Sequence, residues 1–165
     1  MKLETKKAYL LLGSNLGNRE DYLKSALVLI AQNVGHITAK SSIYETAAWG
    51  KTDQPGFLNM AVEVLTSLPP LTVLHEVLNI EQVLGRTRAE KWGARSIDID
   101  VILYANEIVD IKNELQIPHP EMHHRKFVLI PLHEIAPNLL HPVFKKTISL
   151  LLTDLNDPLE VSKKP

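Results

Sequence analysis

The stretch at residues 97–103 constrains the fold most, because apolar and acidic residues alternate along it. A period of two is typical of a β-strand with one buried face. The apolar members, which we expect to face a core, are Ile97, Ile99, Val101 and Leu103. Asp98 and Asp100 then share the opposite face about 7 Å apart, where their charges repel unless a cation lies between them. Mg²⁺ prefers such oxygen ligands, so this pair is a candidate metal site.

A basic loop comes directly before that strand. Its charged and aromatic residues are Arg86, Arg88, Lys91, Trp92 and Arg95. A polyphosphate is bound by Mg²⁺ between its oxygens and by guanidinium groups on the remaining ones, and the loop and strand together supply both. Its length and composition also predict a lid that closes over bound substrates. For the Asp-x-Asp motif alone, a solvent-facing strand with ordinary surface charges remains an alternative.

Hydrophobic periodicity predicts an α+β protein with the element order β-α-β-β-α-β, the ferredoxin-like pattern. The expected strands cover residues 8–12, 36–46, 57–65 and 97–104, and the expected helices cover 18–35 and 70–84. They should form an antiparallel sheet with helices packed on it. A C-terminal extension should add a short strand at 115–117 and short helices within 119–130 and 150–155. The tail from residue 156 is polar, and we expect it to be mobile.

Composition favours one soluble domain over residues 1–165, with its core at about 7–155. Apolar residues make up 45% of the chain, which favours a packed globule over disorder. The absence of cysteine excludes disulfides, a thiol nucleophile and cysteine-based zinc sites. We expect a cytoplasmic location, because the sequence has neither a signal peptide nor an apolar run of membrane-spanning length. The formal net charge of −1 does not indicate a broad nucleic-acid surface.

The motif Lys91-x-Gly-Ala-Arg95-x-x-Asp98-Ile-Asp100-Val-Ile resembles the signature of the hydroxymethyl-dihydropterin pyrophosphokinases of folate biosynthesis. Other motifs of that family occur in its order between about residues 8 and 140. They are Gly13-Ser-Asn-Leu-Gly17, Asp53-Gln-Pro-Gly-Phe-Leu-Asn59, Ile80-Glu81, Gly85-Arg-Thr-Arg88, Ile117-Pro-His119-Pro, Arg125-x-Phe127, Pro131-Leu132 and Glu134-Ile-Ala-Pro137.

The resemblance implies transfer of pyrophosphate from Mg-ATP to the hydroxymethyl group of 6-hydroxymethyl-7,8-dihydropterin, with release of AMP. It implies two Mg²⁺ ions on Asp98 and Asp100, and neighbouring folate-pathway enzymes are candidate partners. The implied catalytic residues are Arg86, Arg95, Asp98 and Asp100. The implied ATP-binding residues are Glu81, Arg88, Trp92, Arg95, Ile99, Val101, His119 and Arg125. The implied pterin-binding residues are Thr46, Ala47, Trp49, Phe57, Asn59, Trp92 and Phe127.

Chemistry agrees with these assignments, since aromatic faces can sandwich a flat pterin and an amide can pair with its edge. Glu81 lies beside the apolar stripe of the second expected helix, where an isolated carboxylate is costly, and we expect it to meet one of the arginines. The chain departs from the family pattern at Phe57, Leu78, Ala94 and Glu114, which affects individual substrate contacts.

Three other interpretations of the sequence have less support. A zinc site at His119, His123 and His124 lacks an acidic or cysteine partner. A ferredoxin-like RNA-binding module would need aromatic residues on its middle strands and a basic face. A Mg²⁺-dependent nuclease would share the aspartate pair, but such enzymes usually recruit more carboxylates.

Overall fold

The computed structural model describes residues 4–46, 56–85 and 96–165. In these residues a central antiparallel sheet has the strand order β5-β1-β4-β3-β8, and β2 also pairs with β4. Its strands are β1 (Lys6–Ser14), β2 (His36–Lys40), β3 (Tyr44–Thr46), β4 (Phe57–Thr66), β5 (Asp98–Tyr104) and β8 (Val161–Lys163). A separate hairpin pairs β6 (Val109–Ile111) with β7 (Leu115–Ile117).

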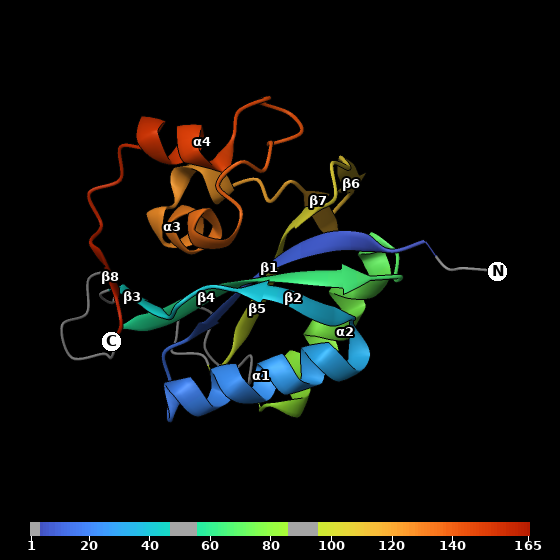
Figure 1. Ribbon diagram of the computed structural model, residues 1–165. Helices are drawn as coiled ribbons and strands as arrows, with labels where there is room; N and C mark the ends of the chain where they lie inside the picture. Colours follow the sequence, from blue (N-terminus) through green and yellow to red (C-terminus); the bar gives the residue numbers. More distant parts are fainter. Residues whose placement is uncertain (1–3, 47–55, 86–95) are drawn as a thin grey trace.

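Helices cover both faces of the central sheet (Figure 1). The helices on one face are α1 (Arg19–Asn33) and α2 (Pro70–Val83). The other face carries α3 (Lys126–Ile135), with α4 (Ile148–Asp154) packed against it, and η1 (Met122–His124) is a short 3-10 helix before α3. Because alternate residues of a strand point to opposite faces, β1 contributes Leu10 and Leu12 to the core under α1 and α2, and Leu11 to the core under α3.

The expected α+β class, with an antiparallel sheet and helices packed on it, is confirmed. The expected strand at 36–46, however, is divided into β2 and β3. Ser41 explains the break, because its Oγ accepts a hydrogen bond from the Ala61 N–H at 2.9 Å and donates one to the Ser42 carbonyl at 2.7 Å. The Ser41 hydroxyl thus accepts the hydrogen bond that a backbone carbonyl would accept in an unbroken strand. Because the segment forms two strands, the element order is more complex than a plain β-α-β-β-α-β.

The strand pair β1 and β5 contains a register shift that changes one sequence prediction. Tyr9 pairs with Leu103, whereas the next residue, Leu10, pairs with Val101, so Ile102 forms a bulge. The bulge reverses the alternation beyond it. Leu103 is therefore buried in the core under α3, not beside Val101 in the core under α1 and α2 as the alternation had predicted.

The helix ends follow local sequence signals. Asn18 Oδ1 accepts a hydrogen bond from the Asp21 N–H at 3.3 Å and so caps α1, and Thr147 caps α4 in the same way through Leu150. Helix α2 begins at Pro70 and ends before Gly85, whose φ of +87° lies in the left-handed region that favours glycine. In the described ranges, no helix is long and apolar enough to cross a membrane.

The polar tail was expected to be mobile, and this prediction is wrong for part of it. Residues 161–163 form β8, which pairs antiparallel with β3 at the edge of the central sheet (Figure 1). The short extension elements predicted at 115–117, 119–130 and 150–155 are present as β7, η1 with α3, and α4.

Candidate active site

Three adjacent strands bring a predicted metal ligand and the predicted pterin amide into one row. Gly13 of β1 pairs with Asp98 of β5 on one side and with Asn59 of β4 on the other. Residues directly opposite each other in antiparallel strands point to the same face. Because neighbouring strands lie about 5 Å apart, Asn59 and Asp98 are separated by roughly 10 Å on that face.

Because Gly13 has no side chain, no side chain lies between those of Asn59 and Asp98 in this row. A Cβ atom at this position would lie 3.0 Å from Asn59 Oδ1 and 3.7 Å from the Leu58 carbonyl oxygen. One row further along the same face, Leu11 pairs with Asp100 and packs in the core under α3. Gly13 and Asn59 are both buried, whereas Asp98 in the same row is partly exposed, so the row runs from a buried amide to a partly exposed carboxylate.

The aspartate pair fits a magnesium ion that is shared with substrate phosphates. Asp98 and Asp100 are both partly exposed, whereas Ile99 between them is buried at 3% exposure. Among the residues that the structure describes, no group of three or more histidines and carboxylates is placed to hold a metal. A pair of carboxylates is nevertheless the usual protein contribution to Mg²⁺, because this ion keeps waters and takes phosphate oxygens as its other ligands.

Glu81 anchors the aspartate strand to α2. This carboxylate is buried at 2% exposure, and its Oε2 accepts a hydrogen bond from the Ile99 N–H at 2.7 Å. The expected meeting of Glu81 with one of the arginines stays a prediction. The side chains of Ile99 and Val101 pack in the core under α1 and α2, so a nucleotide could contact these two predicted ATP-binding residues only through their backbone.

Two predicted pterin-binding residues face each other beside Asn59. Thr46 of β3 pairs with Phe57 of β4, and Tyr44 pairs with Asn59, so all four residues share one face. The Thr46 Oγ1 is buried and has no hydrogen-bond partner in the described part of the chain. An unpaired buried hydroxyl is unfavourable in the free protein, and a ligand with a polar edge would satisfy it.

Tyr44 ties this part of the sheet to α3. Its hydroxyl donates a hydrogen bond to Glu134 Oε1 at 2.5 Å, and Glu134 Oε2 accepts one from the Ser42 N–H at 2.9 Å. Burial, and then the hydrogen bond with Glu134, raises the pKa of Tyr44 to about 12. The tyrosine therefore stays protonated as a donor throughout the physiological range.

The C-terminal extension brings the next predicted residues towards β5. The His119 N–H donates to the Ile102 carbonyl at 2.9 Å, which places His119 beside the aspartate strand. Burial, and then the positive charge of Arg125, lowers the pKa of His119. Nδ1 accepts a hydrogen bond from the Glu121 N–H at 3.1 Å, so the neutral ring carries its proton on Nε2. His119 can thus donate to a phosphate oxygen without being charged.

Arg125 and Phe127 stand together at the start of α3. The guanidinium carbon of Arg125 lies 5.7 Å from the centre of the Phe127 ring, and Phe127 packs against the core under α3. Helix α3 contacts β3, the strand that carries Thr46. The start of α3 therefore presents a cation and an aromatic ring, and near its other end Glu134 accepts the hydrogen bond from Tyr44 of β3.

Six predicted residues lie outside the described ranges: Ala47, Trp49, Arg86, Arg88, Trp92 and Arg95. The loop that was expected to act as a lid falls there as well. The described residues therefore include the predicted metal pair, the predicted pterin amide, His119 and Arg125, whereas the basic loop lies outside them.

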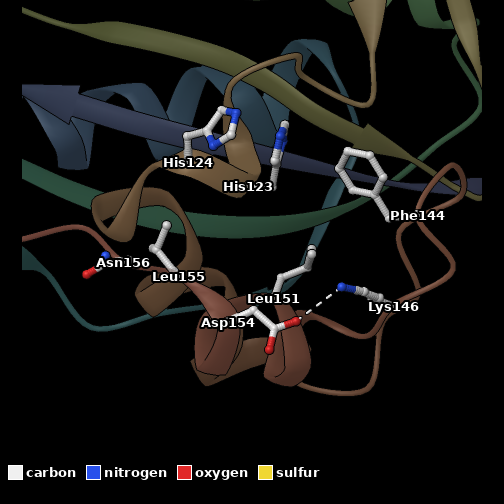
Figure 2. Close-up of a pocket in the computed structure, with 8 residues that line it drawn as sticks. All are labelled: His123, His124, Phe144, Lys146, Leu151, Asp154, Leu155 and Asn156. Carbon is white, nitrogen blue, oxygen red and sulfur yellow. Dashed lines mark hydrogen bonds and ion pairs between the residues drawn. The ribbon is translucent and has the colours of Figure 1, made fainter.

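A pocket of about 510 Å³ lies elsewhere, in the C-terminal extension (Figure 2). Its lining includes His123, His124 and Phe144, together with the ion pair between Lys146 and Asp154 at 3.2 Å. It contains no residue predicted for ATP or pterin. The zinc alternative gains no support in the described ranges, where no cluster of three metal-binding side chains occurs.

Sequence reasoning gave no role to Gly13, Ser14 or the bond from Tyr44 to Glu134. Gly13 belongs to a recognised motif, but its position between Asn59 and Asp98 depends on the pairing of three strands. Ser14 follows it with a buried Oγ that has no hydrogen-bond partner in the described ranges. A serine after a glycine near the end of a strand carries no signal in the sequence that would reveal this.

Comparison with known proteins shows the family to which this chain belongs. The family described as 7,8-dihydro-6-hydroxymethylpterin-pyrophosphokinase (HPPK) matches residues 9–137. A 2-amino-4-hydroxy-6-hydroxymethyldihydropteridine pyrophosphokinase of Bacillus subtilis is 49% identical over 130 residues, which cover 78% of this chain and 77% of the relative. A protein of the same name from Aquifex aeolicus is 40% identical over 140 residues, which cover 85% of this chain and 86% of the relative.

A solved structure shares the fold. The crystal structure of wild-type Plasmodium falciparum HPPK-DHPS with pteroate superimposes with a TM-score of 0.76 at 19% identity, covering 93% of this chain. The matched region is 43% of that protein, so the chain spans less than half of its length. With the family match over most of the chain and relatives at 40–49% identity, this chain belongs to the 7,8-dihydro-6-hydroxymethylpterin-pyrophosphokinase family.

Proposed function

We propose that this chain transfers pyrophosphate from ATP to 6-hydroxymethyl-7,8-dihydropterin, a step of folate biosynthesis. The substrate hydroxyl oxygen bonds to the β-phosphorus, the bond from that phosphorus to the bridging oxygen of AMP breaks, and the hydroxyl proton is released. The products are AMP and the pterin diphosphate. The observation that supports this assignment is the row of Asn59, Gly13 and Asp98, which pairs an amide for the pterin edge with a carboxylate for the metal-bound phosphates.

The separation within that row suits the two substrates. Roughly 10 Å between Asn59 and Asp98 leaves room for a pterin bicycle whose amide edge is at Asn59 and whose hydroxymethyl group points towards Asp98. Thr46 offers a buried hydroxyl without a partner in the described ranges beside this path, and Phe57 and Phe127 offer aromatic faces. The chain therefore orients the attacking oxygen towards the phosphates, and orientation supplies a large share of the rate in such transfers.

Asp98 and Asp100 are the proposed holders of Mg²⁺. When bound, the metal neutralises phosphate charge and fixes the polyphosphate for in-line attack. That two ions bind, as the resemblance implies, belongs to this proposal. His119 bonds through its backbone to the Ile102 carbonyl of β5, and the charge of Arg125 acts on its ring, so a neutral donor and a cation lie near each other and can hold further phosphate oxygens. Arg86, Arg88, Trp92 and Arg95 are proposed to complete the ATP site.

The direct test measures AMP and pterin diphosphate with the purified chain. ATP, MgCl₂ and 6-hydroxymethyl-7,8-dihydropterin should give the two products in equal amounts, and omission of the pterin or addition of EDTA should stop AMP release. ADP with a pterin monophosphate, or AMP release that does not depend on pterin, would contradict the proposed reaction. Incubation with RNA and DNA under the same conditions tests the nucleic-acid and nuclease alternatives, which no observation on this chain favours.

We propose that a neighbouring folate-pathway enzyme binds this chain, and this proposal has its own test. Two solved structures that share this fold are Plasmodium falciparum HPPK-DHPS proteins, in which the matched region is 43% of the chain. Association of this chain with a neighbouring enzyme of the same pathway would be detected by co-elution of the two purified proteins on gel filtration.

A further inference from the structure

The end of the chain crosses from α3 to the edge of the central sheet. The family match ends at residue 137, whereas residues 156–164, here named the C-terminal strap, lie beyond it. Figure 1 shows the strap descending from α4, passing beside α3 and ending along β3. It is held at two places, and each lies next to a residue proposed to bind the pterin.

The first anchor is Asp157 at the start of α3. Its Oδ2 accepts a hydrogen bond from the Lys126 N–H at 3.1 Å, and its Oδ1 accepts one from the Leu159 N–H at 3.0 Å. The first amides of a helix have no partner within the helix, and the side chain of Arg125, the N-cap residue, makes no capping bond here. The Asp157 carboxylate, more than thirty residues along the chain, therefore caps α3. Its negative charge also interacts favourably with the positive end of the helix dipole.

The second anchor is β8 on the edge of the sheet. Val161 pairs with Thr46 and Lys163 with Tyr44, and the Lys164 N–H donates to the Ile43 carbonyl at 2.8 Å. The Lys164 ammonium adds an ion pair with Glu20 of α1 at 3.0 Å. Because β3 is only three residues long, its pairing with β8 on one side is a large part of what holds it in place.

The two anchors fix the two sides of the proposed pterin site relative to each other. Phe127 is the second residue of α3, directly after the amide that Asp157 caps, and Thr46 is the last residue of β3. We propose that the C-terminal strap positions Phe127 and Thr46 for the pterin, with Asp157 as a positioning residue. This inference rests on the proposed function, since it concerns the pterin affinity of that same site.

A strap with only a structural role would lower the melting temperature of the variants without changing one substrate's KM selectively. A positioning role predicts a raised KM for the pterin. Loss of β8 in particular should leave the KM for ATP unchanged, because Asp98 and Asp100 lie on β5 at the opposite edge of the sheet. The split between the two KM values therefore separates the two roles.

The first experiment shortens the chain and measures steady-state kinetics with Mg-ATP and the pterin. A chain ending at Glu160 loses β8 but keeps Asp157, and a chain ending at Lys164 loses only Pro165 and serves as the control. The loss of supporting hydrogen bonds typically changes affinity by about three- to ten-fold. We expect the pterin KM to rise in that range for the shorter chain only, with the ATP KM unchanged.

The second experiment acts at the other anchor. Asp157→Ala should raise the pterin KM about three- to ten-fold, in line with the loss of a helix cap. Asp157→Asn keeps one acceptor oxygen and should recover part of the loss. Asp154→Ala removes an equal charge from the neighbouring α4, where the carboxylate binds only Lys146 among the described contacts, and should leave both KM values unchanged.

The outcomes are distinguishable. An unaltered chain that releases no AMP overturns the proposed function, and the positioning role with it. An active chain whose shortened form and Asp157→Ala form both keep the original pterin KM, at a temperature below their melting transitions, overturns the positioning role alone. If Asp157→Ala changes the pterin KM no more than Asp154→Ala does, the proposed role of Asp157 is overturned.

Discussion

Gly13 and Asn59 face each other across β1 and β4 so closely that a methyl group at position 13 would lie 3.0 Å from the Asn59 amide oxygen. Asn59 is buried at 4% exposure, so its amide has little freedom to move away. The proposed pterin-binding amide thus owes its position to the absence of a side chain on the neighbouring strand.

Gly13→Ala is expected to weaken pterin binding while the chain still folds. The crowded atom is the end of a side chain, which can shift by a few tenths of an ångström, but the shift misaligns the amide with the pterin edge. A hydrogen bond lost in this way costs roughly 1 kcal/mol, so the pterin KM should rise about five-fold with the ATP KM unchanged. Steady-state kinetics with each substrate varied in turn measures both.

Asn59→Ala supplies the control for that prediction. It should itself raise the pterin KM, by about ten-fold, through loss of the amide. Because the added methyl group acts through Asn59, Gly13→Ala should then change little when made in the Asn59→Ala chain. Equal effects in the two backgrounds would show that Gly13 acts by another route.

The aspartate pair is expected to be required for turnover and not for folding. Asp98→Asn and Asp100→Asn should each lower kcat about a hundred-fold or more, because the metal loses a charged ligand. Both side chains are partly exposed, so the melting temperature should hold or rise slightly as like charges are removed. Asp110→Asn, at an exposed position of β6, is the matched control and should keep full activity. Near-normal turnover in either variant would show that the substituted aspartate is not a metal ligand.

Much of this fold follows from patterns inside single segments. The apolar stripe of the expected helix at 70–84 predicted α2, and the alternation at 57–65 predicted β4. Such patterns suffice because a helix or strand repeats its buried positions locally. The aspartate pair was found in the same way, since both carboxylates belong to one strand.

Features that depend on two segments could not be predicted from either one. The bulge at Ile102 is a property of the pairing between β1 and β5, and it moves Leu103 to the other core. The break at Ser41 depends on a bond to Ala61 of the next strand. Strand β8 has only three residues, too few for a period to be recognised, and it exists because β3 offers an open edge.

Glu63 is expected to make stability depend on pH in the acidic range. Burial alone would raise the pKa of this carboxyl, but hydrogen bonds from Tyr9 at 2.6 Å and Thr38 at 2.8 Å, together with Lys7, bring it below the ordinary value of 4.5. A carboxyl with a lowered pKa in the folded state stabilises fully above its unfolded pKa, and this contribution is lost as the pH falls through the lowered value.

Thermal unfolding between pH 7 and pH 3 tests this. Below about pH 4.5, the melting temperature of the unaltered chain should fall more steeply than that of Glu63→Gln. Glu4→Gln, at an exposed position, should follow the unaltered chain. If the melting temperatures of Glu63→Gln and the unaltered chain fall equally as the pH is lowered, Glu63 does not contribute to the pH dependence.

Glu81 is expected to hold the aspartate strand in register for catalysis. Its buried carboxylate accepts the Ile99 N–H at 2.7 Å, and that amide lies between the two proposed metal ligands in the chain. Glu81→Ala leaves a buried backbone donor without this partner, which costs roughly 1–3 kcal/mol of unfolding free energy. It should also lower kcat, because Asp98 and Asp100 shift with the strand.

Glu81→Gln separates the hydrogen bond from the charge. The glutamine amide keeps an acceptor oxygen for Ile99, so the stability measured by urea unfolding should return most of the way to that of the unaltered chain. If Glu81 serves only as this acceptor, kcat should return with it. A glutamine variant that is stable yet inactive would show instead that the negative charge itself acts in the site, as expected for a carboxylate that pairs with one of the arginines of the basic loop.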